Sequence, residues 1–273
     1  MDEIIWRGMN RPQLDAAYNN TAAVANSAAK IAEWTERSAR LRAQKGELLD
    51  LAYGPRPRNR IDIFKCGAER APLFAFIHGG YWQSRSKEIF SCMAEGPLAR
   101  GMDAALIGYT LAPEATLTEI VEEVRAAMRW LRAEGPRSGI AENGVIASGW
   151  SAGGHLTAMV LPEADAGLAI SGIFELTPCR LNYLNEKLHL TADEVVKLSP
   201  IRHPGKRSKP LTIAFGEAEL PELQRQSRDY YAARQKAGPA ARLLPLRGHD
   251  HFSILEELAN PAGRLTEAAV KLA

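Results

Sequence analysis

Residues 149–153 read GWSAG, and this short stretch decides how the rest of the sequence is interpreted. It lies between an apolar run typical of a strand (143–148) and a run typical of a helix (155–161). A G-x-S-x-G pattern between a strand and a helix is typical of a sharp turn that lifts a serine hydroxyl clear of a sheet. Flanking glycines lack Cβ atoms, so neighbouring backbone can approach closely. We therefore interpret Ser151 as a candidate nucleophile.

Apolar runs and helical periodicity alternate along most of the chain. Strands are expected at 61–64, 73–77, 103–109, 143–148, 167–174, 211–215 and 241–246. Helices are expected at 11–44, 120–131, 155–161, 221–237, 254–259 and again after Pro261. This alternation predicts an α/β fold, with a mostly parallel central sheet and helices on both faces.

The domain prediction is a single domain over residues 1–273. No Gly/Ser-rich or Pro-rich linker long enough to separate two domains interrupts the sequence. A helical extension is expected at about residues 1–50. Residues 175–209 break the alternation of strands and helices, so we interpret them as a cap-like insertion over the sheet edge.

Composition excludes several classes of function. Lys and Arg number 34 against 32 Asp and Glu, so no strong basic field predicts a nucleic-acid partner. No apolar run approaches the ~20 residues of a membrane span, and the first residues resemble no secretory signal, so we expect a cytoplasmic protein. The three scattered cysteines (Cys66, Cys92 and Cys179) fit buried free thiols. A homodimer is compatible with this interpretation.

The chemically capable clusters all follow the ends of expected strands. These clusters are residues 78–80, Ser151, residues 216–219 and residues 248–251. Sites in parallel sheets form at the carboxyl ends of strands, so we expect the four clusters to meet. The His-Gly-Gly segment is typical of an oxyanion hole, with backbone N–H donors at Gly79 or Gly80, also Tyr81, and at Ala152. We interpret His78 itself as structural.

A serine nucleophile needs a base and an acid that orients the base. His251 is the preferred base because the segment after it leads into the final helix, and His249 is the alternative. His249 and His251 are two residues apart and could both bind a metal ion, but we predict no metal site. Glu219 is the preferred acid after the strand 211–215, and Glu217 stays open.

Several further motifs extend the pattern over nearly the whole chain. They read HGGYWQ (78–83), GWSAGGH (149–155), SGIFEL (171–176), SP (199–200), ELPELQRQS (219–227), DHF (250–252) and QLDAAYN (13–19). With these motifs the chain resembles the kynurenine formamidase (arylformamidase) branch of the α/β-hydrolases. The resemblance is specific for the branch and only suggestive for the substrate.

The resemblance implies Ser151 as nucleophile, His251 as base and the position of Glu219 as acid. The family usually carries aspartate at this last position, and the longer glutamate keeps Glu217 open. It further implies a serine hydrolase that acts on a small amide or ester, foremost an arylformamide of the N-formylkynurenine type, without metal or organic cofactor. We expect a slot for the amine lined by Tyr81, Trp82, Tyr183 and Asn185, with a core position as the other interpretation of Trp82. The alternatives are a broad carboxylesterase and a non-catalytic ligand-binding protein of the same fold.

Overall fold

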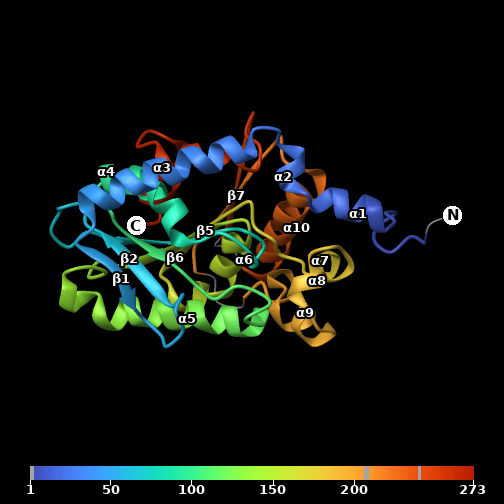
Figure 1. The fold of residues 1–273 in the computed structure, drawn as a ribbon, viewed down its shortest axis with the longest axis horizontal. Helices are drawn as coiled ribbons and strands as arrows, with labels where there is room; N and C mark the ends of the chain where they lie inside the picture. The colour runs from blue at the N-terminus through green and yellow to red at the C-terminus, as the bar shows by residue number, and fades with distance from the viewer. Residues whose placement is uncertain (1–2, 206–208, 239–240) are drawn as a thin grey trace.

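The computed structural model describes residues 3–205, 209–238 and 241–273, and in these ranges eight strands form one sheet (Figure 1). The strands are β1 (Leu48–Ala52), β2 (Arg60–Phe64), β3 (Leu73–Ile77), β4 (Asp103–Ile107), β5 (Val145–Trp150), β6 (Ala166–Ile170), β7 (Leu211–Gly216) and β8 (Ala241–Leu246). Their order across the sheet is β1-β2-β4-β3-β5-β6-β7-β8. The pairs β1–β2 and β2–β4 are antiparallel, and the remaining pairs are parallel.

The central strands are buried on both faces. Every residue of β3, β4, β5, β6 and β7 is buried, which explains why these strands read as continuous apolar runs. The edge strand β1 is half-exposed and carries Asp50, so it lacks this signal and was not predicted. The sheet therefore confirms the predicted fold class.

Helices cover both faces of the sheet. The α-helices are α1 (Arg11–Tyr18), α2 (Asn20–Ala23), α3 (Ser27–Lys45), α4 (Glu95–Ala99), α5 (Leu117–Glu134), α6 (Ala152–Met159), α7 (Thr177–Leu181), α8 (Asn185–Leu188), α9 (Ala192–Leu198), α10 (Pro221–Ala237), α11 (Glu256–Ala259) and α12 (Arg264–Val270). Short 3₁₀ helices are η1 (Lys87–Ala94), η2 (Pro136–Ser138), η3 (Leu161–Glu163), η4 (Pro200–Arg202) and η5 (Ser253–Leu255). Figure 1 shows α3 and α5 on opposite faces of the sheet. Each face has its own core, with α5 and α6 in one and α3, α11 and α12 in the other.

Residues 11–44 are largely helical, as predicted, and the segment is divided into three helices. The Asn19 side chain accepts a hydrogen bond from the N–H of Ala22 and so begins α2. Asn26 stands at the N-cap of α3, where its side chain makes no capping hydrogen bond. Asparagine favours helix starts over helix interiors, so these two residues divide the segment.

The insertion at 175–209 contains α7, α8, α9 and η4 in its described part. It was expected over the sheet edge. In the structure α7 packs against α1 and α9 packs against α5, at one end of the molecule (Figure 1). The link to α1 includes a hydrogen bond from the Tyr183 N–H to the Asp15 carboxylate, at 2.8 Å. The insertion thus lies beside the first helices of the chain.

The structure also bears on the expected free thiols and on the expected absence of a membrane-spanning segment. All three cysteines are free thiols; Cys92 and Cys179 are buried, whereas Cys66 is partly exposed. Within the described ranges, no helix combines the length and the apolar character needed to cross a membrane.

Candidate active site

Ser151 occupies a strained turn between β5 and α6. Its φ is +58° and its ψ is −117°, outside the regions that side-chain-bearing residues ordinarily adopt. The flanking glycines make the turn feasible. A Cβ on Gly153 would lie 2.0 Å from the Ile77 carbonyl oxygen, and one on Gly149 would lie 2.4 Å from the Gly153 carbonyl oxygen. Strain of this kind is typical of functional sites.

His251 and Glu219 form a buried pair. His251 Nδ1 lies 3.0 Å from Glu219 Oε2, and the two residues are 3 % and 6 % exposed. The other carboxylate oxygen, Oε1, accepts hydrogen bonds from the Gly216 N–H and the Ser171 hydroxyl, both at 2.6 Å. These contacts fix the carboxylate, so it can hold the imidazole in one orientation.

Ser171 was missed as a site residue, although it belongs to a quoted motif. The strand predicted over 167–174 ends at Ile170, because Ser171 has φ +50° and turns the chain. This turn brings its hydroxyl to Glu219. The SGIFEL motif was the available signal.

The alternatives for base and acid lie elsewhere. His249 Nδ1 is 3.2 Å from the Ser253 carbonyl oxygen, and its Nε2 is 3.4 Å from Glu257. Glu217 is exposed to solvent. The geometry therefore favours His251 and Glu219 as the base and acid.

Ser151 and His251 open onto one hollow. Its described lining consists of Asn20, Thr21, Gly80, Tyr81, Ser84, Arg85, Trp150, Ser151, His251 and Phe252. The lining thus brings together the ends of β3, β5 and β8 and the short helix α2. Tyr81 is held in this wall because its hydroxyl donates to the Tyr18 carbonyl oxygen at 2.6 Å and accepts from Asn20 Nδ2 at 2.9 Å.

Free backbone donors lie beside the serine. Within the described part of the chain, no hydrogen-bond acceptor faces the N–H groups of Gly79, Gly80, Tyr81 and Ala152. Gly80 has φ +116°, and a Cβ there would lie 2.2 Å from the Ser84 carbonyl oxygen. Unpaired N–H groups at a nucleophile can stabilise a developing oxyanion.

His78 has a structural position, as expected. Its ring stacks on Tyr109 with centroids 4.3 Å apart, and its Nδ1 lies 2.8 Å from the Gly79 carbonyl oxygen. Burial lowers the pKa of its imidazole from 6.5 to about 4, so the ring is neutral at physiological pH. His78 therefore shapes the turn that carries the free N–H groups.

Three of the four residues expected around the amine slot lie outside the lining of the hollow. Trp82 is fully buried and meets His155 edge-on at 5.0 Å, which is the core position left open for it. The Asn185 side chain accepts from the Leu190 N–H at 2.7 Å and so closes its own loop. Tyr183 donates to the Tyr18 carbonyl oxygen at 3.4 Å, the same oxygen to which Tyr81 donates. These placements argue against direct substrate contact by all three.

Trp150, the variable residue of the elbow, is a second missed member of the site. Its indole N–H donates to the His251 carbonyl oxygen at 2.7 Å, and the two rings lie 4.9 Å apart. Trp34 of α3 packs edge-on against Trp150 at 6.0 Å, and Phe252 packs against it at 5.4 Å. Helix α3 therefore supports the histidine segment through Trp34 and Trp150.

Comparison with known proteins agrees with this geometry. The kynurenine formamidase of Danio rerio is 28 % identical to the chain in an alignment of 290 positions that covers 98 % of each protein. That of Drosophila melanogaster is 29 % identical over 77 % of this chain and 76 % of its own length. The chain is a kynurenine formamidase-like α/β-hydrolase.

Other similarities to this formamidase-like protein concern esterases. The BD-FAE family matches residues 61–167. A crystal structure from Silicibacter sp. TM1040, described provisionally as that of a thioesterase, superimposes with a TM-score of 0.85 and 28 % identity over 93 % of this chain and 98 % of that one. Esterase LipC of Mycobacterium tuberculosis is 24 % identical over 75 % of this chain and 59 % of its own length. Together these similarities identify a hydrolase.

Proposed function

We propose that this protein is an arylformamidase that works through a formyl-enzyme on Ser151. The observation that carries the proposal is the hydrogen bond between His251 and Glu219, whose other carboxylate oxygen is also hydrogen-bonded. The strained Ser151 and the free N–H groups belong to the same site. Similarity to kynurenine formamidases over 98 % of the chain supports the formamide as substrate.

The reaction would proceed in two halves. His251 takes the proton of the Ser151 hydroxyl as the oxygen attacks the formyl carbon, and the N–H groups near Gly80 and Ala152 stabilise the oxyanion. The C–N bond then breaks, and the histidine passes its proton to the departing amine. Water, activated by the same histidine, hydrolyses the formyl ester. The net reaction converts a formamide and water into an amine and formate.

The aromatic lining of the hollow fits the proposed substrate. A formyl group carries only hydrogen beyond its carbonyl carbon, so it needs little space next to Ser151. The aromatic rings of Tyr81, Trp150 and Phe252 line the hollow and offer apolar surface to an aryl amine. Tyr81 thus keeps its predicted role in this proposal.

A carboxylesterase is the second candidate, because the similarity to esterases extends over three quarters of the chain. We would compare kcat/KM for formanilide and phenyl acetate, each divided by the rate constant of its spontaneous hydrolysis, because esters are intrinsically more reactive. The proposal expects the larger acceleration for formanilide. A larger acceleration for phenyl acetate would reject the formamidase in favour of the esterase.

Ser151→Ala tests the mechanism independently of the substrate. We expect kcat to fall by about 10⁴- to 10⁶-fold on whichever compound is cleaved. An organophosphonate should label the wild-type serine and leave the variant unlabelled. Activity retained by the variant would overturn the serine mechanism, and a wild-type protein that is neither active nor labelled would point to a non-catalytic binding protein.

A further inference from the structure

Arg85 is the residue of the hollow that the mechanism leaves without a role. It lines the same hollow as Ser151 and His251, and the described lining contains no Asp or Glu. Its side chain passes over the oxyanion turn, because a Cβ placed on Gly80 would lie 2.8 Å from Arg85 Cγ. A positively charged residue therefore shares the hollow with the candidate nucleophile.

The guanidinium of Arg85 has no partner within the described part of the chain. Neither an ion pair nor a hydrogen bond of its side chain is present there, although the residue is partly buried. Other partly buried arginines are paired: Arg37 contacts Glu95 and Glu256, and Arg225 contacts Glu175 and Glu222. Burial lowers the pKa of Arg85, since no carboxylate offsets the desolvation. Charges removed from water are normally paired, so an unpaired one suggests an anionic ligand.

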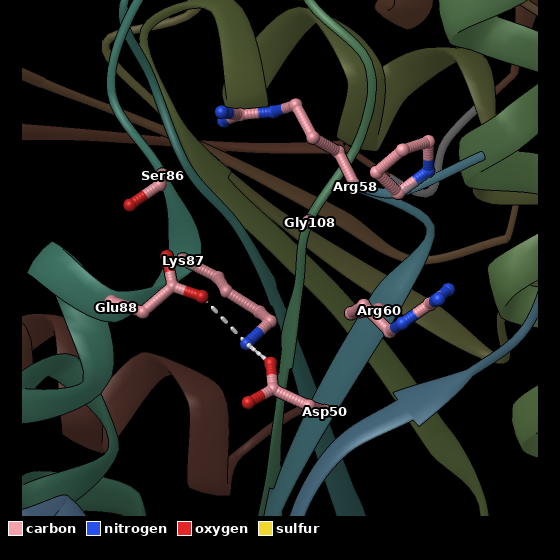
Figure 2. A pocket seen from close by; sticks show the side chains of 8 residues that line it. Asp50, Arg58, Arg60, Ser86, Lys87, Glu88 and Gly108 are labelled. Atoms are coloured by element: carbon pink, nitrogen blue, oxygen red, sulfur yellow. Dashed lines mark hydrogen bonds and ion pairs between the residues drawn. The ribbon is translucent and has the colours of Figure 1, made fainter.

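The backbone around Arg85 is held firmly from behind. Arg58 Nη2 donates to the Arg85 carbonyl oxygen at 2.6 Å. Figure 2 shows the neighbouring Lys87 reaching between Asp50 and Glu88, with ion pairs of 2.6 and 2.7 Å. Because these carboxylates neutralise Lys87, the charge that stays available on this segment is that of Arg85.

The conformation of Arg85 is itself unusual. Its φ is +77°, in the left-handed region that favours glycine. Strained residues persist where surrounding contacts over-determine them, and they cluster at ligand clamps and active sites. The anchors at Arg58 and Lys87 supply such contacts, so Arg85 is presented to the hollow in a defined position.

We propose that Arg85 selects substrates that carry a carboxylate on the amine side of the scissile bond. This inference rests on the proposed function only for the identity of that bond. A formyl group has no atom that could bear the charge, so the carboxylate must belong to the leaving amine. A guanidinium binds a carboxylate through two parallel hydrogen bonds, which orients the ligand as well as attracting it.

The test compares two matched pairs of compounds that differ only in charge. The formamide pair is 3-formamidobenzoate and 3-formamidobenzamide, and the ester pair is 3-acetoxybenzoate and 3-acetoxybenzamide. The readout is the ratio of kcat/KM for the anionic over the neutral member, in which differences in folding or active-site concentration cancel. We expect Arg85→Gln to lower this ratio by about 10- to 100-fold, as loss of a charge-assisted pair would.

Three further variants sharpen the result. Arg85→Lys keeps the positive charge but cannot form two parallel hydrogen bonds to a carboxylate, so it should give an intermediate ratio. Arg85→Glu should reverse the preference, favouring 3-formamidobenzylamine over 3-formamidobenzoate. Arg129→Gln removes one positive charge from an exposed position on α5 and should leave the ratio unchanged. If Arg85→Gln and Arg85→Glu both give the same ratio as the wild type, the proposal is overturned.

The two substrate pairs separate this proposal from the proposed function. If formamides are inert but the ester ratio depends on Arg85, the formamidase assignment fails and the role of Arg85 stands. If formamides are cleaved with a ratio that does not depend on Arg85, the assignment stands and the role of Arg85 fails.

Discussion

Replacing Glu219 by glutamine tests the acid of the site most sharply. The Gly216 N–H and the Ser171 hydroxyl both donate to Oε1, so the carbonyl oxygen of a glutamine must occupy that position. The amide NH₂ group then faces His251 Nδ1, 3.0 Å away in the wild-type protein. A nitrogen that receives this N–H can no longer carry a proton, so the imidazole proton moves to Nε2.

The consequence for catalysis is large. With Nε2 protonated, the histidine cannot accept the proton of Ser151. The corresponding Asp→Asn change in a serine protease, where the tautomer is also inverted, lowers kcat by about 10⁴-fold. A similar loss here corresponds to about 5 kcal/mol of transition-state stabilisation.

The assay is kcat for the preferred substrate, measured for Glu219→Gln and for Glu217→Gln as the matched control. Glu217 is exposed, so its variant should stay within about twofold of the wild type. A larger loss from Glu217→Gln would refute the assignment of Glu219. A wild-type rate in Glu219→Gln would refute the tautomer argument itself.

Two further predictions concern the turn and the core. Gly80→Ala should lower kcat by about 10²- to 10³-fold, because its Cβ collides with a carbonyl oxygen at 2.2 Å and displaces a free N–H. Gly101→Ala is the control, because Gly101 has φ +78° and open space around it. This variant should lose about 1 kcal/mol of stability and keep its kcat. Equal kcat values for the two variants would contradict the oxyanion role. Burial lowers the pKa of His155 from 6.5 to about 4, so the unfolded state binds the proton first and stability falls as the pH drops below 6.5. Urea unfolding should show that, between pH 7 and pH 5, the free energy of unfolding of His155→Gln falls by roughly 2 kcal/mol less than that of the wild type. Equal falls for the two proteins would contradict a buried neutral imidazole.

The buried parallel strands were predictable because each is a continuous apolar run. Helix α10 (Pro221–Ala237) was predicted with both of its ends, since proline begins it and Gly238 follows it. Strand β1 gave no such signal, because an edge strand with Asp50 is neither continuous nor cleanly alternating. Local sequence patterns therefore predicted the buried strands and a helix with clear end signals, but not the half-exposed edge strand.

The candidate site shows the same limit at the level of single residues. Strand ends predicted the meeting of residues 78–80, 151, 219 and 251, which the fold rule for parallel sheets dictates. The SGIFEL motif marks Ser171 as notable, but its partner Glu219 is 48 residues away, and no local pattern indicates that the two side chains meet. Sequence also gave no indication that the Asn185 side chain accepts a hydrogen bond from the Leu190 N–H of its own loop.

The tryptophan in the middle of the elbow has an evolutionary consequence. The motif leaves position 150 free, yet here its ring joins helix α3 to the histidine segment through Trp34 and Phe252. A change of volume at any one of these three positions leaves a gap or a clash at the other two. Among homologues, substitutions at positions 34, 150 and 252 should therefore be correlated, and a chimera that exchanges the N-terminal helices would have to exchange the matching elbow residue with them.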